Sequence, residues 1–249
     1  MVVWRLSEQV SGKWDVDITF TDTGFFRHKG AAWIDGNNDF GKGITIDSQG
    51  RIIIAGTSAN SSSYRDMAVW RLAQINGTWQ LDTSFNNTGY FVHGNATGGN
   101  RNDVGQSIAI DNNQRILVTG RSQATASDYD MVIWRLSIDN QQNWGLDQSF
   151  NGVGYLVQSA AGVNVNDYGN NIVVDSLGRI LVTGYSGLNM AIWQYKLDSN
   201  NQWGLDSDFN GSGFVYFPNG RANEMLLDPQ DRIYITGSTN SEMGVWSFR

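Results

Sequence analysis

The hydrophobic positions of this chain fall into short runs, and residues 44–72 show the pattern most clearly. The apolar runs in this stretch cover 44–47, 51–55 and 67–72. A short polar turn ending in glycine joins the first two runs, and a loop rich in Ser and Asn precedes the third. The pattern predicts a small antiparallel sheet. Because three strands with an apolar face are not stable alone, this sheet must stack on something else.

The same pattern recurs at 108–136, 172–195 and 225–248, so the chain is built from repeats. Each copy carries an Asp, an Arg, a Gly and a Trp in register. These residues are Asp47, Asp111, Asp175 and Asp228; Arg51, Arg115, Arg179 and Arg232; Gly56, Gly120, Gly184 and Gly237; and Trp70, Trp134, Trp193 and Trp246. Differences in length between copies fall in loops, as a true structural repeat predicts.

A connector with its own fixed positions links one copy to the next. Its repeated residues are Trp14, Trp79, Trp144 and Trp203; Asp17, Asp82, Asp147 and Asp206; Phe20, Phe85, Phe150 and Phe209; and Gly24, Gly89, Gly154 and Gly213. A further apolar run follows each glycine, beginning at Phe25, Tyr90, Tyr155 and Phe214. Each unit is therefore predicted to contain four short antiparallel strands.

The repeat length selects the fold class. The unit recurs after 66 residues at its longest, from Trp4 to Trp70, and after 53 at its shortest, from Trp193 to Trp246. Four-stranded units of this length fit the blades of a β-propeller, whereas solenoid repeats are shorter and immunoglobulin-like domains longer. We expect an all-β propeller of four-stranded antiparallel blades in one domain, 1–249. Its parts are a partial repeat at 1–28, repeats at about 39–93, 103–158 and 167–217, and a partial repeat at 220–249.

The two ends of the chain decide how the propeller closes. The third strand of the unit occurs five times and the first strand only four times. The surplus copy is either Met1, Val2, Val3, Trp4, Arg5 and Leu6, or Met243, Gly244, Val245 and Trp246. Four blades closed by the N- and C-terminal strands, with one strand displaced, is preferred because the terminal segments are nearly complementary. The alternatives are part of a larger propeller, or strand exchange between subunits.

Three motifs together resemble a known family. They are LDTSF or LDQSF followed by glycine, then DSQGRIIIAG or DSLGRILVTG, and then MAVWRL. This combination is similar to the delta-60 repeat family of bacterial β-propeller-like repeat proteins, and the similarity covers nearly all of the chain. The resemblance implies a propeller fold and an extracellular or cell-surface setting. It implies no agreed activity.

Composition narrows the classes of partner and compartment. The net charge is -7 and no run of Lys or Arg occurs, which disfavours nucleic acid and anionic membranes as partners. No apolar run approaches the roughly 18 residues of a membrane-spanning helix, so no membrane insertion is expected. The chain has no cysteine and few lysines, which suits a protein outside the cytoplasm. It opens without a signal peptide, so we also consider a leader and further repeats upstream of Met1.

Candidate ligand-binding residues are few. Asp39, Asp103 and Asp167 stand in NDFG, NDVG and NDYG before each predicted innermost strand, and we expect them near one mouth of the channel. Carboxylates and backbone carbonyls there would suit Ca²⁺, although no DxDxD cluster is present; no other cofactor is expected. Trp33 has no counterpart in the other repeats and is the first candidate for a binding residue.

Most other repeated side chains have a structural interpretation. Tryptophans of the third strand, such as Trp70, are expected between blades. The connector tryptophans, such as Trp79, would stack either on a sugar or on a neighbouring blade. Asp47 is expected to cap the tight turn that ends at Arg51. His28 and His93 hold equivalent positions, which indicates repeat inheritance.

No sequence motif for catalysis is present, and a nucleophilic cysteine is excluded. The chain is therefore expected to be a non-catalytic structural or binding module that interacts with carbohydrate or protein outside the cell. One alternative is a glycan hydrolase or lyase that uses the channel-mouth carboxylates. Another is a self-assembling subunit that associates through its terminal strands.

Overall fold

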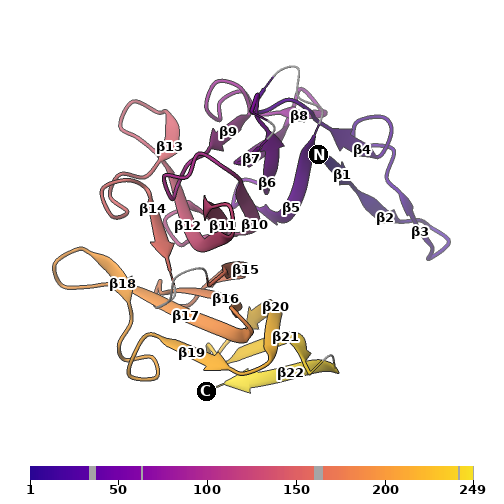
Figure 1. The fold of residues 1–249 in the computed structure, drawn as a ribbon. Helices are drawn as coiled ribbons and strands as arrows, with labels where there is room; N and C mark the ends of the chain where they lie inside the picture. The colour runs from indigo at the N-terminus through magenta and orange to yellow at the C-terminus, as the bar shows by residue number, and fades with distance from the viewer. Residues whose placement is uncertain (34–37, 63, 160–164, 241, 249) are drawn as a thin grey trace.

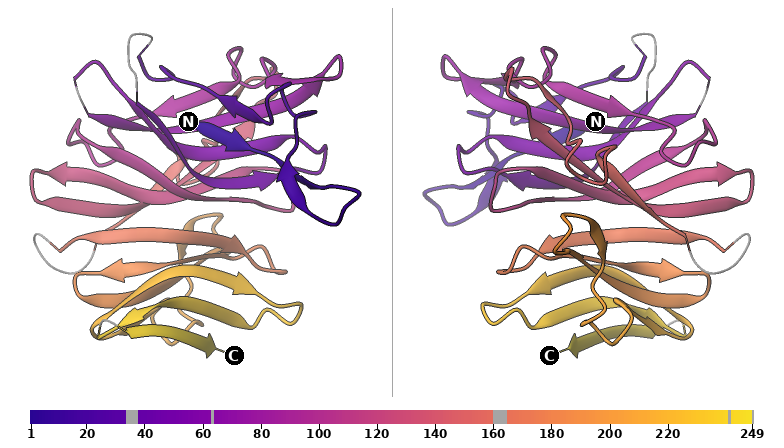
Figure 2. Two further views of the ribbon diagram at one scale, coloured as in Figure 1. Left: turned by 90° about the vertical axis from the view of Figure 1, so that its right-hand side faces the viewer. Right: turned by 90° about the vertical axis from the view of Figure 1, so that its left-hand side faces the viewer.

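The fold is all-β, as the repeat pattern predicts. A computed structural model describes residues 1–33, 38–62, 64–159, 165–240 and 242–248, and within these ranges it contains no helix. The sheets follow one another in chain order and form an arc (Figure 1), and the side views show them stacked face to face (Figure 2). Three five-stranded sheets form full blades, with a part-blade at each end of the chain.

The three full blades share one topology. The first contains β5 (Asp39–Ile46), β6 (Ile52–Ala59), β7 (Arg65–Ile75), β8 (Thr78–Leu81) and β9 (Tyr90–His93). The second contains β10 (Asp103–Ile110), β11 (Ile116–Thr125), β12 (Asp128–Ile138), β13 (Trp144–Leu146) and β14 (Tyr155–Gln158). The third contains β15 (Asp167–Val174), β16 (Ile180–Ser186), β17 (Asn189–Leu197), β18 (Trp203–Leu205) and β19 (Phe214–Phe217). The innermost strands β5, β10, β15 and β20 (Gly220–Leu227) lie side by side along the inside of the arc (Figure 1).

The outer edge of each blade differs from the sequence-based expectation of four strands. β7 has 11 residues; its first half pairs with β9 and its second half with β8. The connector thus supplies a fifth strand, β8, which the sequence-based prediction of four strands did not include. The physical reason is that the backbone groups in the second half of β7 need partners at the edge of the sheet.

The terminal part-blades are complementary in content. The N-terminal one has β1 (Val2–Trp4) paired with β4 (Phe25–Arg27), and β2 (Leu6–Glu8) paired with β3 (Trp14–Val16). The C-terminal one has β20, β21 (Ile233–Thr239) and β22 (Glu242–Phe248). In the described residues no strand pairing joins the two part-blades, so the arc stays open (Figure 1). The expected closure of a four-bladed ring is therefore not observed in this structure.

The hydrophobic core lies between the blades. Four clusters each combine side chains of two neighbouring sheets, for example Val69 of β7 with Val118 of β11 and Trp134 of β12. The second strands β6 and β11 are buried on both faces, which explains their continuous apolar runs. Trp70, Trp134 and Trp193 are fully buried, which confirms the expected packing between blades.

The two ends of the blades have different chemistry. We call the end that carries the loops into β5, β10, β15 and β20 the loop face, and the opposite end the turn face. On the turn face, Asp47 accepts hydrogen bonds from the backbone N–H of Gln49 and of Arg51, each at 2.9 Å. Asp111, Asp175 and Asp228 cap their turns in the same way, so the expected turn caps are confirmed.

Candidate functional site

The aspartates of the NDxG motifs are buried on the loop face, where they hold loops. They are the first residues of β5, β10 and β15, one position inside the strands that they were expected to precede. Asp39 lies 2.8 Å from His28 Nδ1 and accepts a hydrogen bond from the Ser58 hydroxyl. Asp103 accepts hydrogen bonds from the backbone N–H of Asn95 at 2.6 Å and of Ala96 at 3.2 Å. Their carboxylates therefore face protein groups.

Environment moves the pKa values of these two aspartates in opposite directions. Burial opposes ionisation of Asp39, but hydrogen bonds from His28 and Ser58 outweigh it and lower the pKa of Asp39. Burial raises the pKa of Asp103 despite its hydrogen bonds. In the described part of the chain, no group of three or more His, Asp or Glu side chains is arranged to hold a metal ion.

Trp33 lies on the loop face at the edge of a described range. Its side chain is 42% exposed. The rest of its loop, 34–37, lies outside the described residues. A binding role for Trp33 stays a prediction.

A three-part clamp on the turn face joins each blade to the next. Trp79, Trp144 and Trp203 pack against Phe20, Phe85 and Phe150 of the preceding unit, with ring centres 5.5, 5.3 and 5.5 Å apart. In the second junction the Arg71 guanidinium carbon lies 4.8 Å from the Phe85 ring centre and 5.2 Å from that of Trp144. Arg135 repeats this contact at the third junction, with Phe150 and Trp203. The connector tryptophans thus hold neighbouring blades together, one of their two expected roles.

The arginine in the clamp is buried with a fixed partner. Arg71 is 1% exposed and donates from Nε to Asp82 at 2.7 Å and from Nη2 to Ser84 at 2.9 Å. Burial opposes ionisation of Asp82, but the Ser84 hydrogen bond and the Arg71 charge outweigh it and lower the pKa of Asp82. Asp82 also accepts a hydrogen bond from the backbone N–H of Ser84 and so caps the turn that follows it.

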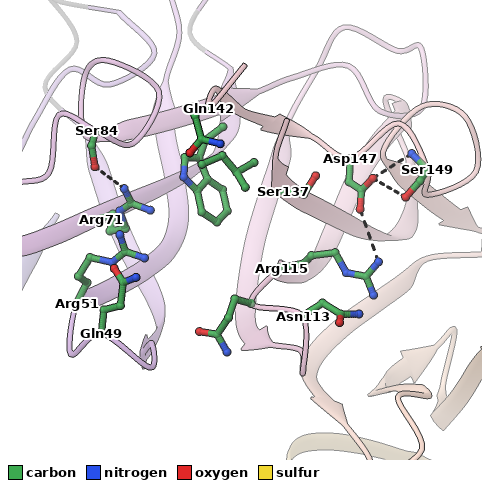
Figure 3. A pocket seen from close by; sticks show the side chains of 13 residues that line it. Gln49, Arg51, Arg71, Ser84, Asn113, Arg115, Ser137, Gln142, Asp147 and Ser149 are labelled. Carbon is green, nitrogen blue, oxygen red and sulfur yellow. Dashed lines mark hydrogen bonds and ion pairs between the residues drawn. The ribbon is translucent and has the colours of Figure 1, made fainter. Parts of the chain in front are cut away.

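A polar cavity of about 730 Å³ opens between the first and second blades beside this clamp. Figure 3 shows side chains of both blades around it, among them Arg51, Ser84, Asn113, Arg115 and Gln142, and Trp144 also lines the cavity. Arg51 and Arg115 are each bonded to a turn aspartate, Asp47 and Asp111, at 2.6 Å. Because the charges are paired, this cavity presents hydrogen-bonding groups with little net charge.

A second polar cavity, of about 510 Å³, lies along the inside of the arc. Each innermost strand has a register irregularity there, between Gly41 and Gly43 in β5 and at the matching places in β10, β15 and β20. The lining includes Lys42, Gln106, Asn170, Asn171 and Glu224. Asn171 donates to Glu224 at 2.6 Å, and burial raises the pKa of Glu224. Amides and one carboxyl group at this place suit the hydroxyl groups of a polar ligand.

The clamp is incomplete at both ends of the chain. Trp14, the first connector tryptophan, is 68% exposed, because no phenylalanine of a preceding unit covers it. Trp4, the first third-strand tryptophan, is 60% exposed, whereas its equivalent Trp70 is fully buried. At the other end Phe209 has no connector tryptophan following it. Met243 and Val245 of β22 are also exposed.

Sequence reasoning missed a column of aromatic and basic side chains on the loop face. Tyr168 of β15 stacks on Tyr185 of β16 at 4.5 Å, and Arg121 and Arg221 of the neighbouring blades lie over these two rings. The signal was present in strand positions that vary between repeats. Tyr168 follows the Asp of NDYG, and Tyr185 and Arg121 directly follow the repeated glycine.

Comparison with known proteins supports the repeat architecture. Residues 155–188 match a family described as beta-propeller repeat. No curated protein matches the chain.

The solved structures that match the chain include three enzymes, each with low identity and a low TM-score. One is a gluconolactonase from Xanthomonas campestris, 12% identical, covering 84% of this chain and 71% of its own, with a TM-score of 0.29. Another is a putative oxidoreductase (glucose dehydrogenase) from Thermus thermophilus, 11% identical, covering 96% and 91%, with a TM-score of 0.33. A third is a mannose phosphorylase from Leishmania mexicana, 9% identical, covering 85% and 83%, with a TM-score of 0.28. At these values the activities of those enzymes carry no argument for this chain.

One further feature concerns the membrane. Among the described residues there is no helix with the length and apolar character needed to span a bilayer.

Proposed function

We propose that the chain is a structural β-propeller module that completes its blades by head-to-tail association with a second copy of itself. One observation carries this proposal: the Phe–Trp contact that links the N-terminal part-blade and the three full blades in turn is left half-made at each end. Trp14 lacks a phenylalanine partner and Phe209 lacks a tryptophan partner. Bringing the two ends together in different copies would form the same contact again.

The strand content of the two ends supports this pairing. β20, β21 and β22 are the first, second and third strands of a blade, whereas β1 to β4 are a third strand and its outer partners. Together the two ends contain all the strands of one blade, and they contain its third strand twice. Because only one third strand fits, either β22 or the β1–β2 segment is displaced when the shared blade forms.

Exposed apolar side chains give the association its driving force. Val2, Trp4 and Leu6 at one end, and Met243 and Val245 at the other, are exposed on the two end sheets, each of which has a neighbouring sheet on one side only. Unpaired strand edges and apolar patches of this kind favour association with another chain. The contact is heterologous, so it gives a closed ring or an open filament according to the rotation between copies.

The same ends would also fit a four-bladed ring within a single chain or adjacent repeats of a larger propeller, and these are the alternatives. We further propose an extracellular setting, which the lack of cysteine and the low lysine content support. A carbohydrate or protein ligand is also part of the proposal. The polar lining of the second cavity, along the inside of the arc, favours carbohydrate.

Sedimentation velocity over a wide range of concentrations tests the association. We expect a mass above the 27.6 kDa of one chain, falling towards that value on dilution. Trp14→Ala should weaken association at least tenfold, because an aromatic anchor at an interface is worth roughly 2 kcal/mol or more. Trp33→Ala, at an exposed tryptophan that takes no part in the clamp, is the control. A mass of one chain at every concentration would remove the proposal.

A further inference from the structure

The arginines of this chain divide into two groups by position. Seven of the twelve described arginines form ion pairs with aspartates: Arg5, Arg51, Arg71, Arg115, Arg135, Arg179 and Arg232. All of these lie towards the turn face. The other five have no ion pair with a described carboxylate: Arg27, Arg65, Arg101, Arg121 and Arg221.

Four of the five unpaired arginines lie on the loop face, each over an aromatic ring. The guanidinium of Arg65 lies 4.8 Å from the ring centre of Phe40, and that of Arg101 lies 5.9 Å from that of Tyr64. Arg121 lies 4.5 Å from the Tyr168 ring centre, and Arg221 lies 4.3 Å from that of Tyr185. A guanidinium that stacks on a ring keeps its N–H groups directed sideways, where they are available for an acceptor.

Arg121, Tyr168, Tyr185 and Arg221 form one continuous column across three sheets. Tyr168 and Tyr185 stack with their planes 13° apart, and an arginine caps the column at each end. Arg121 comes from β11 of the second blade, the tyrosines from the third blade, and Arg221 from β20.

Two aspartates of the second blade, Asp103 and Asp130, are buried, and burial raises the pKa of both carboxyl groups. Arg221 is exposed, and Arg121, Tyr168 and Tyr185 are half-buried. The accessible charge of the column is therefore positive on a protein whose net charge is -7.

We propose that this column binds an acidic oligosaccharide, with Arg121 and Arg221 contacting its carboxylate or sulfate groups. Both faces of each tyrosine ring are covered within the column, so the tyrosines hold the two guanidinium groups in place and meet the sugar only with their edges and hydroxyl groups. Two guanidinium groups separated by two stacked rings cannot both reach one sugar, so the ligand must be an oligomer. Arginine recognises carboxylate and sulfate through paired N–H donors. A nucleic acid depends on an extended positive surface for its affinity, whereas this column offers two guanidinium groups only.

The test measures binding of polygalacturonate, alginate and chondroitin sulfate by affinity electrophoresis, with dextran as a neutral comparison. We expect at least one acidic glycan, and not dextran, to retard the full chain. The double variant Arg121→Gln with Arg221→Gln should lose at least tenfold in affinity, and so should Tyr185→Ala. Arg27→Gln, an unpaired arginine outside the column, is the matched control and should bind as wild type.

Three outcomes would overturn this proposal. They are retention by none of the acidic glycans, equal retention by dextran, and binding that the double variant leaves unchanged. Polyglutamate and single-stranded DNA are run in parallel, and tighter binding to either than to the glycans would contradict the ligand class. Single Arg221→Gln, at an exposed side chain, replaces the double variant if that one does not fold. Because the column lies apart from the Trp14 and Phe209 clamp, its failure would leave the proposed association standing.

Discussion

A buried guanidinium at each of two blade junctions shows how single residues stabilise this arc. Arg71 and Arg135 are both 1% exposed, and each has an aspartate, a serine and two aromatic rings as neighbours. Burying a charge is unfavourable unless it is paired and hydrogen-bonded. The third blade avoids that requirement, because Gln194 stands at this position and Lys196 bonds to Asp206 instead.

Removing the aspartate that pairs with a buried arginine should lower the stability of the protein. Asp147→Ala would leave Arg135 buried without its carboxylate, and we expect a loss of about 3–5 kcal/mol in the free energy of unfolding, measured in urea. Asp17→Ala removes the same partner from Arg5, whose side chain is 35% exposed, and should cost much less. Equal losses in the two variants would contradict the role given to burial.

His93 predicts a pH dependence of stability. Trp134 donates to its Nδ1 at 3.1 Å, and burial lowers the pKa of His93. Below about pH 6.5 the unfolded chain binds a proton that the folded chain does not, so this contribution to stability falls as the pH falls. His93→Gln, which copies Gln158 of the next unit, should show a smaller loss than wild type on acidification. A difference in unfolding free energy that stays constant with pH would refute this assignment.

Local residue roles and the packing of the third-strand tryptophans between blades followed from the sequence, whereas the partners of the connector tryptophans did not. The Asp47 turn cap was predictable because donor and acceptor lie within four residues. The Phe85 and Trp144 contact was not, because both were recognised as fixed positions without any indication that they come from adjacent blades. The stacked column was missed because its residues differ between repeats.

At the scale of the element, the repeated glycines set how closely two strands approach. A Cβ atom added at Gly184 would lie 1.8 Å from the carbonyl oxygen of Tyr168, and Gly56, Gly120 and Gly237 meet the same obstacle. The sequence marked these glycines as fixed positions. Glycine is needed at these positions because the register of the innermost strand is irregular beside them and brings its backbone too close for a Cβ atom.

Gly184→Ala should therefore separate β15 from β16. We expect a loss of about 2–4 kcal/mol in the free energy of unfolding, at the upper end for a single substitution. Gly204→Ala is the matched control, because nothing lies within 4 Å of its added Cβ. Thermal or chemical unfolding of both variants measures this difference in stability. A Gly184→Ala variant as stable as the control would be inconsistent with a backbone clash.

Strand boundaries show the limit of sequence reasoning about elements. The existence and order of the strands were predictable from their apolar runs. Their lengths were not, because β5 and β7 extend into polar segments whose backbone pairs regardless of side chain. The connector strand β8 was missed for the same reason.

At the scale of the whole molecule, the repeat period predicted blades but could not decide closure. Terminal segments that complete one another within a chain also complete one another between chains. The structure keeps β1 to β4 and β20 to β22 unpaired with each other, and it leaves Trp14 exposed. The central claim is therefore that the unfinished clamp joins separate copies head to tail.

Mixing two blocked variants tests this claim most directly. Trp14→Ala removes the clamp residue of the N-terminal part-blade, and Phe209→Ala removes its proposed partner near the other end. Each variant alone should sediment as a single chain of 27.6 kDa, because every junction then lacks one side of the clamp. An equimolar mixture should form dimers, since one intact junction remains between the two variants. A mixture that stays at the mass of one chain while wild type associates would contradict the account.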